Sequence, residues 1–138
     1  MWEEEITESG NGPYLKMLGI TIQEADGGRA VLRMDWAPGL DTFRINHVMH
    51  GGAIASLIDA TASMALRTLH RAEDPPWRGT STSDLNVTYL NAATKAVIAE
   101  ARVLRSARTI AFFQVDVRDI DGVLVAVGRA TMYIRPGD

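Results

Sequence analysis

The chain has 138 residues, 46% of them hydrophobic, and a formal net charge of −3. This length suits one domain with a sizeable core, and the absence of a basic run argues against nucleic acid or an anionic membrane as a partner. The chain has no cysteine, which excludes disulfides, thiolate metal ligands and a cysteine nucleophile. Its three histidines are too few and too badly spaced for a zinc site, so no metal is expected.

Residues 1–11 are predicted to form a flexible, polar lead. Their acidic character does not fit a signal peptide, and no apolar stretch reads as a membrane span, so we expect a cytoplasmic protein. No repeat, low-complexity segment or linker divides the chain. Residues 1–138 are therefore predicted to form a single domain.

The next segments predict a short helix over 12–18 and a β-hairpin. Residues 19–26 and 29–36 alternate apolar and polar side chains on either side of Gly27-Gly28, which is the pattern of two strands joined by a tight turn. Residues 37–49 are predicted to form a loop, and a loop of this length without structure of its own is often functional.

Residues 50–69, HGGAIASLIDATASMALRTL, read as a helix that is apolar on nearly every side. Such a helix is expected to be buried, yet it contains one carboxylate, Asp59. Burial of an unpaired carboxylate is costly, so Asp59 either has a partner, such as Arg67 or the hydroxyl of Ser63, or performs chemistry. In the second case Asp59 is a general base or a nucleophile, because desolvation makes a carboxylate more basic.

Two glycines, Gly51 and Gly52, stand at the start of this helix. Either they only form a tight turn into the helix, or their free N–H groups bind a substrate carbonyl at the positive end of the helix dipole. Asp59 follows Gly51 by eight residues, roughly 12 Å along the axis at about 1.5 Å per residue. One carbonyl cannot reach both groups on a single helix. If both act in one reaction, the protein is a homodimer with two composite sites.

Four strands are expected after the helix, over residues 84–91, 95–104, 109–118 and 122–135. The last three are joined by short turns and predict an antiparallel meander. An antiparallel sheet with one apolar face and a single apolar helix has one simple arrangement, in which the sheet wraps the helix. The predicted fold class is α+β.

The stretch HGGAIASLIDATASMA resembles the signature of hotdog-fold acyl-CoA thioesterases of the phenylacetic-acid-degradation (PaaI-like) family. In that family HGG opens the central helix and an acid follows eight residues after the first glycine. STSDLNVTYLNAAT resembles the family's next strand, and VLRSARTIAFFQVDVRD with GVLVAVGRATMY resembles its closing hairpin. The resemblance covers about residues 14–134. It implies a long central helix wrapped by a curved sheet, a homodimer with a continuous sheet, and usually a homotetramer built as a dimer of dimers.

The resemblance implies hydrolysis of an acyl- or aryl-acyl-CoA to the free acid and coenzyme A, with no separate cofactor. It implies that the N–H of Gly51 polarises the thioester carbonyl, while Asp59 of the opposite subunit attacks it or activates water. It gives His50 a role in positioning the loop. Ser63 and Thr82 match positions where relatives carry a hydroxyl that holds a water.

The segment before the helix departs from the family pattern N-x-x-G-x-x-H-G-G. Asn46 lies only four residues before His50, and His47 stands in the glycine's place. Asn46 can therefore perform the family's role only through a shifted loop. The phosphates of coenzyme A require cations, and guanidinium groups pair well with phosphate. The resemblance makes Arg105 and Arg108 the candidates, because relatives hold basic residues near these positions; the alternative is that both are solvated surface side chains.

Two other functions stay open. A hydroxyacyl dehydratase or enoyl hydratase of the same fold carries a catalytic histidine followed by prolines, and no proline lies close to His50 in the sequence. A non-catalytic acyl-CoA-binding hotdog protein would not require the acid at Asp59. The identity of the acyl group is not specified by the sequence. Apolar residues that could line its pocket are Trp36, Phe43, Met49, Met64 and Trp77.

Overall fold

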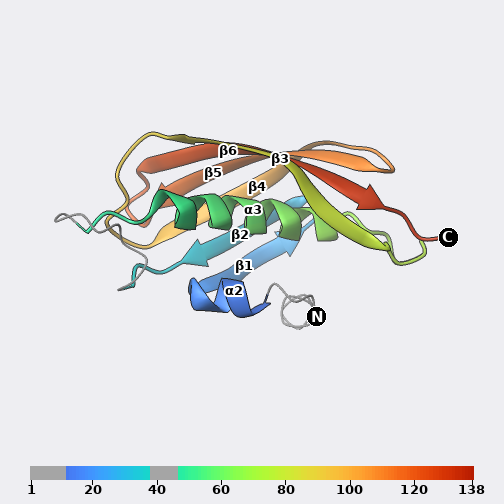
Figure 1. Cartoon of the computed structure of the whole chain (residues 1–138), viewed down its shortest axis with the longest axis horizontal. Helices are drawn as coiled ribbons and strands as arrows, with labels where there is room; N and C mark the ends of the chain where they lie inside the picture. Colours follow the sequence, from blue (N-terminus) through green and yellow to red (C-terminus); the bar gives the residue numbers. More distant parts are fainter. Residues whose placement is uncertain (1–11, 38–46) are drawn as a thin grey trace.

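The computed structural model describes residues 12–37 and 47–138. Its elements are α2 (Gly12–Met17), β1 (Ile20–Asp26), β2 (Arg29–Met34), α3 (Gly51–Arg67), β3 (Gly79–Tyr89), β4 (Val97–Ser106), β5 (Ile110–Asp119) and β6 (Leu124–Arg135). The strands form one antiparallel six-stranded sheet in the order β1-β2-β4-β5-β6-β3. The curved sheet wraps around α3, so the predicted hotdog fold of class α+β is confirmed (Figure 1).

Helix α3 packs on the inner face of the sheet, mainly against β2 and β4. Small residues let the helix lie close to the strands. In β6, a Cβ added to Gly128 would come within 2.9 Å of the Ile58 side chain. The fully buried residues of the helix are Leu57, Ile58, Thr61, Ala62, Ala65 and Leu66. The prediction of a buried helix is therefore confirmed for the side of α3 that faces the sheet.

The turn between β1 and β2 is the predicted Gly27-Gly28 pair, and both glycines have positive φ, 56° and 83°. Glycine adopts such angles without steric strain, which is why this sequence can form a tight hairpin. The N–H of Gly28 also donates to the Thr68 hydroxyl at 2.7 Å. This bond fastens the hairpin to the end of α3.

Strand β3 differs most from its prediction, because it begins at Gly79 rather than Asp84 and ends at Tyr89. The segment from Thr80 to Asp84 is polar and shows no apolar alternation, but its backbone pairs with β6 as far as Arg135. Strand β3 lies at one edge of the sheet and is exposed along most of its length. Exposure explains why the start of this strand lacks the apolar pattern of the inner strands.

The outer face of the sheet carries ion pairs between neighbouring strands. Arg29 on β2 bonds to Glu24 on β1 and to Glu100 on β4. These hydrogen bonds, with Glu24 first, raise the pKa of Arg29 above its ordinary value. The pairs occupy the sheet face opposite α3. In the parts of the chain that the structure describes, no helix is long and apolar enough to cross a membrane.

Candidate functional site

Helix α3 begins at Gly51, with His50 as its N-cap. His50 has an extended backbone (φ −61°, ψ 131°), and its Nδ1 accepts a hydrogen bond from the N–H of Gly52 at 2.8 Å. The His50 carbonyl accepts from the N–H groups of Ala53 and Ile54 at 3.0 and 3.3 Å. The N–H of Gly51 donates to no residue of the described chain. It is thus available to a substrate oxygen at the positive end of the helix.

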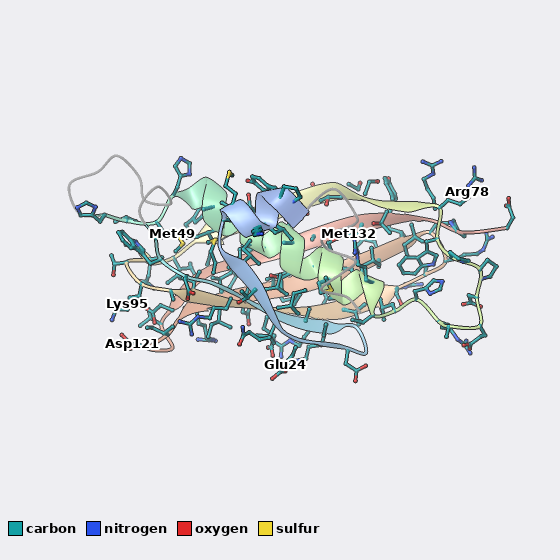
Figure 2. All side chains as sticks on the ribbon, turned by 90° about the horizontal axis from the view of Figure 1, so that it is seen from below. Glu24, Met49, Arg78, Lys95, Asp121 and Met132 are labelled. Atoms are coloured by element: carbon teal, nitrogen blue, oxygen red, sulfur yellow. The ribbon has the colours of Figure 1, made fainter. Side chains whose placement is uncertain are left out.

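A cavity of about 440 Å³ opens beside Gly51. Its walls come from the segment before α3, the first turn of the helix, the last residue of β3 and the segment that follows β3, and they are mostly apolar. They consist of Val48, Met49, Gly51, Ile54, Tyr89, Leu90, Asn91, Ala92 and Ala93. Figure 2 shows Met49 at this end of the molecule and Arg78 at the other. An apolar group bound here would lie next to the Gly51 N–H.

The five pocket candidates are not brought together. Met49 lines the cavity beside Gly51, whereas Trp77 lines a different cavity. Met64 is buried in the core, and Trp36 stacks edge-on against His47 with ring centroids 6.2 Å apart. Phe43 lies outside the described residues.

Asp59 lies near the middle of α3 and faces the edge strand β3. The Thr82 hydroxyl donates a hydrogen bond to its Oδ1 at 2.6 Å. The hydrogen-bond partner of Asp59 is therefore a residue of β3. In the sequence, only the family resemblance marks Thr82 as a position for a functional hydroxyl. Asp59 is half-buried rather than fully buried, because it lies beside the sheet edge.

The other hydroxyls of α3 play different parts. Thr61 is buried and donates to the Leu57 carbonyl at 2.6 Å, a bond back to its own helix. Ser63 is half-buried. It lies one turn beyond Asp59 and therefore on the same side of the helix. Among the residues that the structure describes, no group of histidine and acidic side chains is arranged to hold a metal ion.

Gly51 and Asp59 are connected to opposite ends of β3. Thr82, near the start of the strand, binds Asp59, and the hydroxyl of Tyr89, its last residue, donates to the Gly51 carbonyl at 2.6 Å. The sequence pattern places Tyr89 only within the strand expected over residues 84–91 and gives it no role. Its contact spans 38 positions, so no local pattern could have revealed it.

The segment before α3 contains a non-glycine residue with positive φ. His47 has φ 50°, in the left-handed region that favours glycine, and it stands where the family pattern has glycine. The indole N–H of Trp36 donates to the His47 carbonyl at 3.3 Å. Asn46 lies outside the described residues, so its role stays a prediction.

A second cavity, of about 390 Å³, lies at the C-terminal end of α3. Arg108, Arg71, His70 and Trp77 line part of it, and Asp74 adds one negative charge. The two arginine candidates are therefore separated by the structure: Arg108 lines this cavity, whereas Arg105 on β4 is not among its lining residues.

Known proteins resemble this chain in sequence and in fold. The family model of the thioesterase superfamily matches residues 46–126. Acyl-coenzyme A thioesterase 13 of Homo sapiens is 31% identical over 88% of this chain and 84% of its own length. A conserved protein of Pseudomonas aeruginosa is 30% identical, with a TM-score of 0.77 over 88% of this chain and 92% of its own. The E. coli PaaI protein from the phenylacetic acid degradation operon, 22% identical, shares the fold with a TM-score of 0.81 over 99% of this chain and 93% of its own. This chain therefore belongs to the thioesterase superfamily and is a thioester hydrolase with the hotdog fold.

Proposed function

We propose that the protein hydrolyses acyl-CoA thioesters to the free acid and coenzyme A. The observation that carries this proposal is a pair of groups on α3: an N–H available at Gly51, and a carboxylate, Asp59, anchored by Thr82. Carbonyl polarisation and an oriented carboxylate are what thioester hydrolysis requires. The name of the human relative, an acyl-coenzyme A thioesterase, supports coenzyme A as the leaving group.

The catalytic unit in this proposal is a homodimer built by β3. Strand β3 has 11 residues and forms an exposed edge, and such an edge is a template for pairing with another chain. Antiparallel pairing about a twofold axis near the middle of the strand puts the start of one β3 beside the end of the other. Because Thr82 holds Asp59 and Tyr89 holds Gly51, this arrangement brings Asp59 of one chain towards Gly51 of the other.

The reaction then follows from the chemistry of the two groups. The thioester oxygen accepts a hydrogen bond from the Gly51 N–H, which stabilises the negative charge that develops on it. Asp59 either attacks the carbonyl carbon and forms an anhydride that water hydrolyses, or removes a proton from the attacking water. In both routes the C–S bond breaks, the acyl group leaves as a carboxylate, and the thiolate of coenzyme A takes up a proton.

The two cavities suit the two parts of such a substrate. The apolar cavity beside Gly51 takes the acyl group. The cavity with Arg71 and Arg108 takes the phosphates, because guanidinium groups pair well with phosphate. It lies just beyond the end of α3 at Arg67, which is roughly 12 Å from Asp59 along the helix axis. An extended pantetheine arm can span this distance.

The test is thiol release from a panel of acetyl-, medium-chain, long-chain and aryl-acetyl-CoA, measured with a thiol reagent. Wild-type protein should release thiol from at least one member, and Asp59→Asn should lower kcat by about 100-fold or more, because it removes the base or nucleophile. Asp116→Asn, on the sheet face opposite α3, is the control and should keep wild-type kcat. Absence of release from every substrate, or full activity of Asp59→Asn, would refute the proposal.

The same panel separates the other two functions. Titration calorimetry that shows tight binding, with intact acyl-CoA recovered afterwards, would indicate a binding protein. Addition of water to an enoyl-CoA, with the thioester retained, would indicate a hydratase.

A further inference from the structure

Strand β3 reaches α3 through two hydroxyl groups, those of Thr82 and Tyr89. Side chains alternate between the two faces of a strand, and these residues are an odd number of positions apart, so a regular strand would point them in opposite directions. The register against β6 shifts between Thr82 and Asp84, which leaves Ser83 as the extra residue of a β-bulge. The bulge restores the phase, so that both hydroxyls face the helix.

The partners on β6 confirm this phase. Thr82 is opposite Met132 and Tyr89 is opposite Ala126, and both of these β6 residues are buried in the core. Bulges near functional sites commonly re-aim a side chain in this way. The inner face of β3 therefore carries two anchoring hydroxyls, one for each group of the candidate site.

We propose that Tyr89 is the positioning residue for Gly51, the oxyanion donor. Glycine has the greatest backbone freedom of all residues, so a glycine N–H is a preorganised donor only if its neighbours restrain it. The inference rests on the proposed function. The Tyr89 side chain also lines the cavity assigned to the acyl group, but the positioning role belongs to its hydroxyl, which bonds to Gly51.

Contacts on both sides of Gly51 restrain it. The bonds from Ala53 and Ile54 to the His50 carbonyl fix the peptide before it, which contains its N–H. The Tyr89 hydroxyl holds the carbonyl after it, and the Tyr89 ring covers its Cα closely, since an added Cβ would lie 3.2 Å from Cζ. Tyr89 is the only one of these partners that comes from the sheet, so it fixes the first turn of α3 relative to β3.

The first test is Tyr89→Phe, which removes the hydroxyl and keeps the ring. A looser donor loses transition-state stabilisation more than substrate binding, so kcat should fall by about tenfold while KM stays within about threefold. The control is Tyr133→Phe, because both tyrosines are 51% exposed. Tyr133 follows the buried Met132 in β6, so its side chain points to the opposite, outer face of the sheet. Unchanged kcat in Tyr89→Phe, or an equal loss in Tyr133→Phe, would overturn the inference.

The second test does not depend on turnover. In the Asp59→Asn background, isotope-edited infrared difference spectra report the carbonyl stretch of a bound, ¹³C-labelled thioester. Polarisation by the Gly51 N–H should lower this frequency relative to the free thioester, and adding Tyr89→Phe should reverse part of the shift, whereas adding Tyr133→Phe should not. A frequency that Tyr89→Phe leaves unchanged contradicts the positioning role.

The two proposals fail in distinguishable ways. If wild-type protein releases no thiol from any acyl-CoA, the proposed function fails and the role of Tyr89 fails with it. If Asp59→Asn abolishes release while Tyr89→Phe keeps wild-type kcat and carbonyl frequency, only the inference about Tyr89 is wrong.

Discussion

In the first turn of α3, one backbone N–H takes part in capping the helix and another is available to a substrate. The His50 imidazole caps the helix by accepting from Gly52, so the N–H of Gly51 is left for another acceptor. The resemblance implied a positioning role for His50, and its capping bond supplies a physical way to perform it. The two neighbouring residues thus contribute different atoms to one site.

At this residue scale, Gly51→Pro isolates the contribution of one N–H. Proline is tolerated at the first position of a helix, and the extended backbone of His50 (ψ 131°) suits a residue before proline. We expect the variant to fold and to lose about 100-fold or more in kcat, because it cannot donate to the thioester oxygen. Circular dichroism and the thiol-release assay measure the two effects.

Gly51→Ala is the matched control for this change. Its Cβ meets the Tyr89 ring at 3.2 Å, as the proline Cβ does, but the N–H remains. Equal activity of the alanine and proline variants would show that crowding against Tyr89, and not the missing N–H, controls the rate.

At the scale of elements, β3 determines which side chains reach α3. Thr82 and Asp84 pair with consecutive residues of β6, Met132 and Thr131, and Ser83 is the extra residue between them. Removal of Ser83 would therefore leave a regular strand in which Thr82 is still opposite Met132. The bulge is needed only because the chain carries one residue more than the register uses.

This geometry makes the outcome of a deletion predictable. Deletion of Ser83 should keep kcat within about threefold of wild type, whereas Thr82→Val should lower it by about tenfold through loss of the bond to Asp59. Steady-state kinetics with the preferred acyl-CoA compare the two. A deletion variant that is as impaired as Thr82→Val would mean that the bulged backbone itself is required to place the hydroxyl.

At the scale of the whole molecule, the proposed dimer can be tested by mixing two inactive chains. A heterodimer of Asp59→Asn and Gly51→Pro has one site with both defects and one site with neither. Random reassociation of equal amounts should therefore restore roughly a quarter of the wild-type activity. Refolding the two chains together, followed by the thiol-release assay, gives the measurement.

Each variant refolded alone is the control and should remain inactive. Failure of the mixture to gain activity, when sedimentation shows that mixed dimers form, would contradict a site shared between chains. The same sedimentation data give the mass and distinguish a dimer from a dimer of dimers.

Much of this architecture is determined by local sequence. The long run of apolar and small residues marks α3, Gly27-Gly28 marks the first hairpin, and the alternation of the last three strands marks the meander. The spacing of Gly51 and Asp59 is also local, because helix geometry converts eight positions into a distance. Periodicity and turn chemistry depend on neighbouring residues, so they can be read without the fold.

Contacts between distant segments were decided only by the tertiary structure. The pairing of Thr82 with Asp59, the contact of Tyr89 with Gly51 and the place of Arg108 on a cavity all join elements that are separate in the sequence. The polar start of β3 becomes a strand because β6 supplies its backbone partners. Such features depend on strand register, which arises when the whole sheet closes around α3, and register is not encoded in any single stretch of the chain.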